Sequence, residues 1–373
     1  MKRWQSALVF TALLRSAAAD AAPEDNADRS SSLAHAVSVA SVLPSRSLPK
    51  ELLLLWEARQ NFGAVEGFAV GDGGIFLASG ARGGSVALNR KGQPIWSNGG
   101  ASGWLLSPLA ARFGFVAVVS PLSLVGWSER GTLLYELALR ADETVENLML
   151  AALSNGSVAL VSGRHLFVVD ATGRQTLELL LPEKAVALVE VGAELTVALA
   201  SGRVVSVSTW GTIHYRGAIG RQPEAAMAYR EDLLIATSEG VHLLNLTSRR
   251  SRLVLAYEPE ERLLALETNA LGFQLISRSG QLRRVDLGGR LAFSLKLEPG
   301  QATAGGPNFF MTTDDIGQTA VATPEGRLLI VSPEGAVRAQ QTLFCARVTL
   351  LSQRSGQVLV GCSDGKIVAY GAG

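Results

Sequence analysis

The feature that most limits how this chain can fold is an internal repeat with a period of about forty residues. Eight short apolar segments, each ending in a small polar residue, recur along the sequence: IFLAS, FVAVVS, SVALVS, TVALAS, LLIATS, GFQLIS, TAVAT and VLVGCS. A turn with glycine usually follows, and successive turn glycines lie 39, 38, 40, 46 and 39 residues apart at Gly163, Gly202, Gly240, Gly280, Gly326 and Gly365. A fixed period indicates one structural unit that is used many times.

Each unit contains four short strands. An apolar segment such as NLMLAAL or AVALVEV precedes the marked one, and a further apolar strand, a polar hairpin and a last strand follow the glycine turn, as in HLFVVDATGRQTLEL. Four short antiparallel strands joined by turns with Gly and Asp are typical of a propeller blade. We therefore predict an all-β fold, an eight-bladed β-propeller with four-stranded antiparallel blades.

The two ends of the repeat region predict how the ring closes. The last unit ends after its third strand, KIVAY, and an unpaired strand, ELLLLWEAR, precedes the first unit. Pairing of these two strands would leave no exposed sheet edge. Residues 51–373 number 323, which is about 40 for each of eight blades. The predicted propeller domain is therefore 51–373, closed by an N-terminal strand in the last blade.

Two units depart from the pattern and leave an alternative open. The second, 104–139, has Pro121 and Leu122 where the others have glycine, and the seventh has a longer lead-in at 298–307. Seven blades with an additional hairpin would also accommodate these departures.

Residues 1–19 have the pattern of a secretory signal peptide. Lys2 and Arg3 precede a short apolar run, and small residues from Ala19 to Ala21 offer a cleavage site. The run is too short for a transmembrane segment, which needs about 20 apolar residues. We predict a flexible linker at 20–50 and a periplasmic or secreted protein; a cytosolic N-terminus is the alternative, because Arg15 closely follows the apolar run.

The charge balance argues against some classes of partner. The chain has 34 Lys and Arg against 33 Asp and Glu, and only 18% of its residues are charged. A net charge of +1 excludes binding to nucleic acid or to a membrane surface by bulk electrostatics. The 47% hydrophobic content fits strands buried on both faces.

The hairpin segments SVALNRKGQPIW and FVVDATGRQTLEL, and the closing VLVGCSDGKIVAY, resemble the repeat of the quinoprotein-like (PQQ-like) propellers. In that family a Trp at the blade end packs against the next blade. Here it is kept as Trp56 and Trp96 and is replaced by Tyr135, Tyr215 and Phe293. This loss of the blade-end Trp indicates a divergent, non-catalytic branch of the family. As an exported chain of 373 residues with eight predicted blades and no enzyme site, the protein resembles the branch that serves outer-membrane protein assembly, although no cysteine for a lipid anchor lies near the cleavage site.

The sequence offers little catalytic chemistry. A quinone-dependent dehydrogenase needs several oxygen ligands for Ca²⁺ in the central funnel, and the acids of the predicted inner strands are few: Glu66, Glu190, Glu267, Asp314 and Asp315. We predict no enzyme and no catalytic, cofactor-binding or metal-binding residue. A quinone- or ligand-binding propeller with a degenerate central site is the alternative function.

Other motifs have structural explanations. GCSDG, which ends at Gly365, matches G-x-S-x-G, but it lies between two strands and not between a strand and a helix. The histidines lack the spacing of a zinc site; they are His35, His165, His214 and His242.

The only two cysteines are Cys345 and Cys362. In the predicted hairpin Cys362 faces residue 348, which leaves Cys345 roughly 10 Å away. A disulfide requires the chain before Val348 to fold back, because the Cα atoms must come within about 7 Å. The pair is therefore either a disulfide or two buried thiols.

One basic cluster stands out. Arg249, Arg250 and Arg252 lie on the hairpin between the third and fourth strands of one unit. They form either a solvated turn or a contact patch for an acidic partner; nucleic acid is not favoured, because no aromatic residues are interleaved with them. We predict a monomeric scaffold that binds other proteins through blade loops, with a role in the cell envelope implied by the family resemblance alone.

Overall fold

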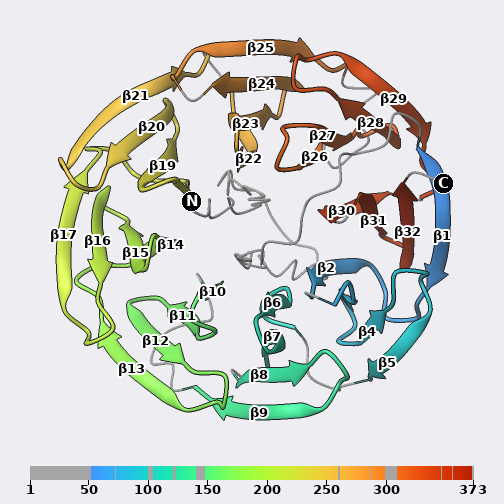
Figure 1. Ribbon diagram of the computed structural model, residues 1–373, viewed down its shortest axis with the longest axis horizontal. Coiled ribbons are helices and arrows are strands. Elements are labelled where there is room, and N and C mark those ends of the chain that lie inside the picture. Colours follow the sequence, from blue (N-terminus) through green and yellow to red (C-terminus); the bar gives the residue numbers. More distant parts are fainter. Residues whose placement is uncertain are drawn as a thin grey trace, which may run out of the picture.

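The computed structural model describes residues 52–71, 73–99, 104–120, 123–139, 148–258, 261–286, 288–298, 309–345, 347–354 and 356–371. The predicted signal peptide and linker lie outside these residues. The described strands form a ring of eight four-stranded antiparallel sheets, as predicted from the repeat (Figure 1). The seven-bladed alternative is therefore wrong.

Four blades follow one another from the start of the ring. Blade 1 consists of β2 (Val65–Val70), β3 (Phe76–Gly80), β4 (Ser85–Leu88) and β5 (Pro94–Asn98). Blade 2 consists of β6 (Leu109–Ala111), β7 (Gly114–Val119), β8 (Ser123–Ser128) and β9 (Leu133–Ala138). Blade 3 consists of β10 (Met149–Ala152), β11 (Val158–Ser162), β12 (His165–Val169) and β13 (Gln175–Leu180). Blade 4 consists of β14 (Ala185–Val191), β15 (Glu194–Leu199), β16 (Arg203–Val207) and β17 (Ile213–Ala218).

The other four blades complete the ring. Blade 5 consists of β18 (Ala225–Tyr229), β19 (Asp232–Thr237), β20 (Gly240–Asn245) and β21 (Arg250–Ala256). Blade 6 consists of β22 (Leu263–Asn269), β23 (Gly272–Ser277), β24 (Gln281–Asp286) and β25 (Leu291–Lys296). Blade 7 consists of β26 (Phe310–Thr313), β27 (Thr319–Ala322), β28 (Arg327–Val331) and β29 (Val337–Thr342). Blade 8 consists of β30 (Val348–Arg354), β31 (Gln357–Cys362), β32 (Lys366–Gly371) and β1 (Leu53–Arg59).

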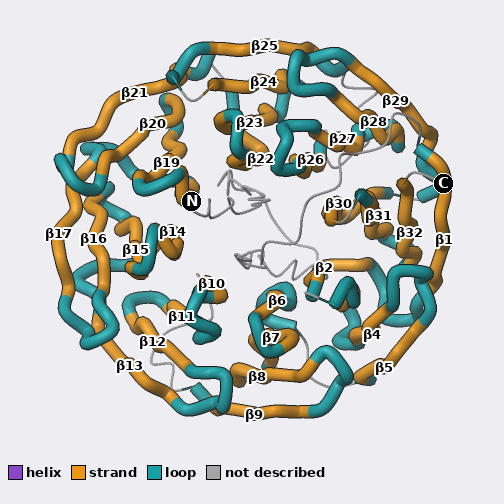
Figure 2. Tube along the Cα trace, viewed as in Figure 1, coloured by secondary structure: helices purple, strands orange, loops and turns teal. Residues whose placement is uncertain are grey.

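Blade 8 closes the ring with strands from both ends of the repeat region. β1 pairs with β32 in antiparallel register, from Leu53 opposite Gly371 to Arg59 opposite Lys366. This confirms the predicted pairing with KIVAY. Figure 2 shows these two strands side by side at the rim, and no helix among the described segments. Within these segments there is accordingly no helix long and apolar enough to cross a membrane.

Burial falls from the inner strands to the outer ones. β3 and β7 are buried along their whole length, whereas β13 at the rim alternates between exposed and half-buried residues. Inner strands have a neighbouring blade on each face, so both of their faces are apolar. Apolar side chains from adjacent blades therefore fill the space between the sheets and form the core.

The blades are joined at the rim by the residues that the sequence marked as blade ends. Trp56 donates its indole N–H to the Arg90 carbonyl of the next blade at 2.8 Å, and Trp96 donates to the Glu129 carbonyl at 2.8 Å. Tyr135 packs in the same way on the turn of blade 3. These contacts confirm the expected packing of the blade-end aromatic residues.

Phe293 reaches the turn of blade 7 at Gly335, whereas Tyr215 is largely exposed. Leu177 takes the corresponding place in blade 3, where it contacts Gly211 of blade 4. An aliphatic side chain therefore performs at one junction the packing that tryptophan performs at two others.

Candidate functional site

A buried polar network lies between blades 6 and 7, on their inner strands. A carboxylate oxygen of Glu267 accepts a hydrogen bond from the Thr313 backbone N–H, and Gln274 accepts one from the Thr319 hydroxyl. Gln274 also donates to the Gly317 carbonyl at 2.9 Å. These polar groups bond to one another across the blade junction, so the network joins two blades instead of presenting ligands to the funnel.

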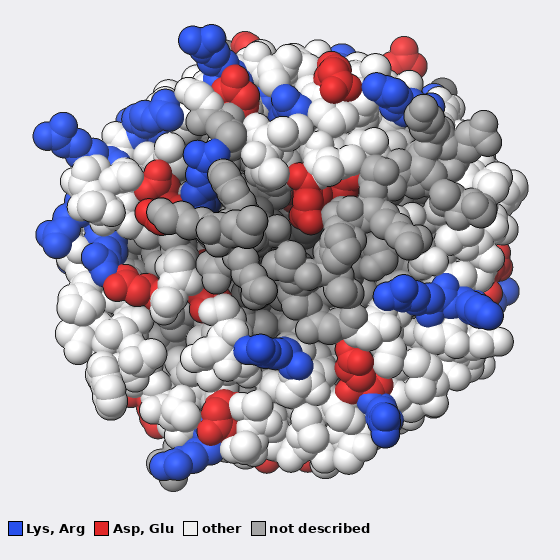
Figure 3. Space-filling view, in the orientation of Figure 1, with Lys and Arg blue, Asp and Glu red and all other residues white. Residues whose placement is uncertain are grey.

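The other acids of the predicted funnel are dispersed. Glu190 accepts hydrogen bonds from the backbone and hydroxyl of Ser154 at 2.8 and 2.7 Å. Burial raises the pKa of Asp315, which follows β26; acidic side chains lie over this part of the face in Figure 3. Across the described ranges, no three His, Cys, Asp or Glu side chains come together as a metal site would require.

The arginine patch, Arg249, Arg250 and Arg252, lies on the rim of blade 5. All three side chains are exposed. Arg249 has a φ of 61° in the turn before β21, where the Asn245 carbonyl accepts its N–H at 2.8 Å. Among the described residues none of the three forms an ion pair. Lys and Arg side chains gather along the rim over β17 and β21 (Figure 3).

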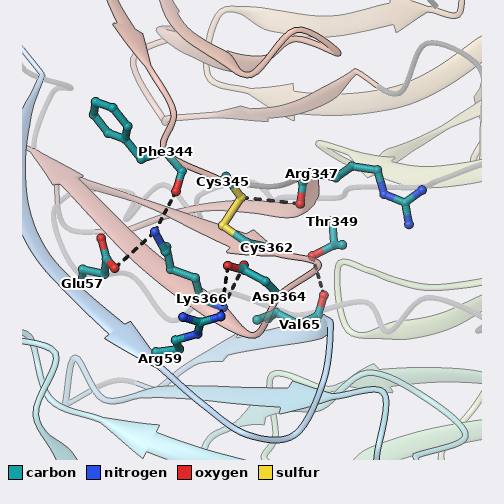
Figure 4. Close-up of a disulfide and its surroundings, with 10 residues drawn as sticks. All are labelled: Glu57, Arg59, Val65, Phe344, Cys345, Arg347, Thr349, Cys362, Asp364 and Lys366. Atoms are coloured by element: carbon teal, nitrogen blue, oxygen red, sulfur yellow. Dashed lines mark hydrogen bonds and ion pairs between the residues drawn. A yellow bond between two sulfur atoms is a disulfide. The ribbon is translucent and has the colours of Figure 1, made fainter. Parts of the chain in front are cut away.

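Cys345 and Cys362 form a disulfide with a Cα separation of 5.6 Å (Figure 4). Val348 lies opposite Cys362, which is the register expected from the sequence. The chain before Val348 turns back toward β31, and the Ser363 N–H donates to the Arg347 carbonyl at 2.9 Å. This turn brings Cys345 closer to Cys362 than extended spacing predicts.

The disulfide lies beside the strand that closes the ring. Lys366 of β32 donates to the Phe344 carbonyl at 2.9 Å and pairs with Glu57 of β1 at 3.2 Å (Figure 4). One side chain therefore connects the chain next to Cys345 with the N-terminal strand.

The remaining motifs are structural where they can be placed. Gly365 closes a turn by donating its N–H to the Cys362 carbonyl at 3.2 Å, so GCSDG is a hairpin turn as predicted. His165, His214 and His242 lie on strands of three different blades, and His35 lies outside the described residues. Burial lowers the pKa of His242.

A site that the sequence did not single out lies between blades 1 and 2. It is a cavity of about 410 Å³, which we call the tryptophan groove, and its described lining residues come from both blades and the chain between them. They are Gly83, Trp96, Ser97, Asn98, Trp104, Val119, Val125, Trp127, Gly131, Leu133 and Glu136.

A β-bulge places the charged and apolar rim residues of the groove on one face. The register between β8 and β9 shifts so that Trp127 faces Leu133 and Val125 faces Glu136. Trp127 and Val125 are two residues apart and share a face of β8. Without the bulge at Leu134, Leu133 and Glu136 would point to opposite faces of the strand.

Trp104 completes the groove from the connection between β5 and β6. It forms an isolated bridge with Val119, and its indole N–H donates to the Gly84 carbonyl at 3.1 Å. Its ring lies 5.9 Å from that of Trp127, with 54° between the planes. Four tryptophans lie within residues 56–127, and this density could have pointed to the groove in the sequence. The repeat pattern, however, predicts a position only for Trp56 and Trp96.

Comparisons with known proteins agree on the fold. No protein-family model matches the chain, and no curated protein sequence matches it either. Solved structures do match: the C-terminal WD40 domain of Sif2 at 12% identity and a TM-score of 0.68, covering 88% of this chain and 100% of that one.

Virginiamycin B lyase from Staphylococcus aureus is similar at 11% identity and a TM-score of 0.57, covering 86% of this chain and 99% of the lyase. BamB from Moraxella catarrhalis matches at 15% identity and a TM-score of 0.48, covering 86% and 100% of the two chains. At such identities the similarity to the WD40 domain and to the lyase shows the fold alone. The chain is an eight-bladed β-propeller.

Proposed function

We propose that the chain is a non-catalytic scaffold that binds an acidic segment of a partner protein at the arginine patch. The observation that carries this proposal is the contrast between the patch and other arginines of the rim. Arg203 pairs with Glu183 and Arg216 with Glu194. Among the described residues, by contrast, none of the three exposed arginines of the patch forms an ion pair within 4 Å, although the charge of Arg252 acts on Asp232 at longer range.

The geometry of β21 favours an extended acidic segment. Arg250 and Arg252 are two residues apart on a strand, so they share one face, and Arg252 reaches the turn of blade 6 at Gly289. Because the net charge is only +1, attraction of an acidic partner depends on this local cluster.

The test uses a fluorescent oligoglutamate peptide as the probe, with anisotropy as the readout. Replacing Arg249, Arg250 and Arg252 by Ser should weaken peptide binding about tenfold, since exposed charge pairs are worth up to about 1 kcal/mol each. Binding should also weaken as salt is added.

The matched control replaces three paired arginines by Ser: Arg203, Arg216 and Arg338, each within 4 Å of a glutamate. This variant should keep most of the affinity for the peptide. Equal affinity of the patch variant and the native chain would overturn the proposal.

We also propose that the protein is exported and acts in the cell envelope. It is supported by the basic and apolar N-terminal pattern and by the repeat's resemblance to quinoprotein-like propellers. Expression in a bacterium with a periplasm should give a mature protein in that compartment, cleaved near Ala19 to Ala21. Mass analysis of the fractionated protein tests this expectation, and an uncleaved cytosolic product would contradict it.

A role in outer-membrane protein assembly would be supported by an altered outer-membrane protein profile after deletion of the gene.

A further inference from the structure

We propose that the tryptophan groove is a binding site for a small organic cation, an alkylammonium compound. The proposal rests on the groove alone and is independent of the arginine patch, which lies on blade 5. A cavity of about 410 Å³ falls within the usual size range of small-molecule sites.

Two of the three tryptophans that line the groove offer carbon surface and not hydrogen-bond donors. The indole N–H of Trp96 is donated to the Glu129 carbonyl, and that of Trp104 to the Gly84 carbonyl. With these donors used inside the fold, the two rings present their apolar and π surfaces to a ligand. Rings of this kind attract cations through their quadrupole, and Trp does so most strongly.

The charge of the lining also favours a cationic ligand. Glu136 is the charged side chain among the described lining residues, and no Lys, Arg or His is among them. An anion would meet a carboxylate without a compensating donor, so a cation is favoured. Ser97 and Asn98, at the blade 1 side, can hydrogen-bond a polar group of the ligand.

The floor of the groove suits the alkyl part of such a ligand. Val119, Val125 and Trp127 are at most 9% exposed, so they form a fixed apolar base. Leu133, which is 54% exposed, stands at the rim beside Glu136. An ammonium group that carries methyl groups would bury them on this base and keep its charge near the carboxylate.

The experiment titrates the full chain with choline, and in parallel with its neutral isostere 3,3-dimethylbutan-1-ol. Isothermal calorimetry and tryptophan fluorescence report binding, with sodium chloride matching the ionic strength. Choline should bind saturably and quench the fluorescence. The neutral isostere should bind about tenfold more weakly, because it keeps the shape and loses the charge.

Glu136→Gln tests the carboxylate and should weaken choline binding about tenfold. Glu178→Gln is the matched control. Glu178 holds the equivalent position on the rim strand of blade 3, opposite Phe167 as Glu136 is opposite Val125, and it is exposed. The control should bind choline as the native chain does.

Trp104→Leu should weaken choline binding and reduce the fluorescence response, to which Trp96 and Trp127 can still contribute. The melting temperature of this variant shows whether it remains folded. The proposal is overturned if choline gives no saturable signal, if the neutral isostere binds as tightly, or if Glu136→Gln has no effect. Binding of a peptide with trimethyllysine, but not of choline, would overturn the assignment to a free small molecule.

Discussion

At the scale of single residues, glycine and aromatic side chains meet at the junctions between blades. Gly131 has a φ of +83°, and the ring of Trp96 lies where a Cβ would be, at 2.6 Å. Gly92 receives Trp56 in the same way, at 2.5 Å. These glycines therefore serve two purposes, since they permit the left-handed turn and leave room for the ring.

A substitution can separate these two purposes. Gly192 also has a positive φ, of +65°, but no other atom lies within 4 Å of the place that a Cβ would take. Gly192→Ala should lower the free energy of unfolding by about 1 kcal/mol from backbone strain alone. Gly131→Ala should cost about 2–4 kcal/mol, because it also displaces Trp96. Urea denaturation of both variants measures the difference; equal costs would show that Trp96 moves freely.

The packing of Trp56, Trp96, Tyr135 and Phe293 was predictable from the sequence because each one recurs at a fixed place in the repeat, but the same prediction was wrong for Tyr215, which is 47% exposed. Trp104 was not predictable, because it lies in the connection between blades 1 and 2 and its role depends on a bridge to Val119. The place of Glu136 in the groove was not predictable either, because a β-bulge determines the direction in which its side chain points.

At the scale of elements, the last blade is stabilised by more than strand pairing. The disulfide joins β31 to the segment that enters the blade, and the residues it links are 17 apart in the sequence. A link across a loop of this size stabilises a fold by about 3 kcal/mol, largely by restricting the unfolded chain. The sequence does not decide between a bond and two thiols, because strand spacing alone places the cysteines too far apart.

Reduction of the disulfide should therefore lower the melting temperature of the purified chain. A variant with Cys345→Ser and Cys362→Ala should melt at the temperature of the reduced native chain and should not respond to a reductant. Calorimetry with and without reductant checks both expectations. An unchanged melting temperature of the reduced native chain would show that the other contacts of blade 8 suffice.

At the scale of the whole molecule, the repeat determines the fold and the differences between repeats determine the sites. Eight blades follow from the period and from the unpaired terminal strand, so the ring and its closure were predictable. The tryptophan groove was not, because its lining comes from two blades whose register and separation no single repeat encodes. The arginine patch was visible as a cluster in the sequence, but only the structure shows that its arginines form no close ion pair among the described residues.

Truncation tests the closure of the ring. Removing residues 1–59 deletes β1 and leaves β32 as an open edge, so the shortened chain should self-associate and melt earlier. Removing 1–50 keeps β1 and should leave a monomer with the native melting temperature. Size-exclusion chromatography with light scattering compares the two, and a stable monomer without β1 would contradict the closure argument.

The pairing of β1 with β32 also has a consequence for biosynthesis. β1 precedes every other described strand in the sequence, and its partner β32 follows all of them. β1 therefore stays without its native hydrogen bonds while the strands between it and β32 are made. A growing chain consequently carries an unpaired strand until β32 has been made, and this strand is the segment that a chaperone would have most reason to shield.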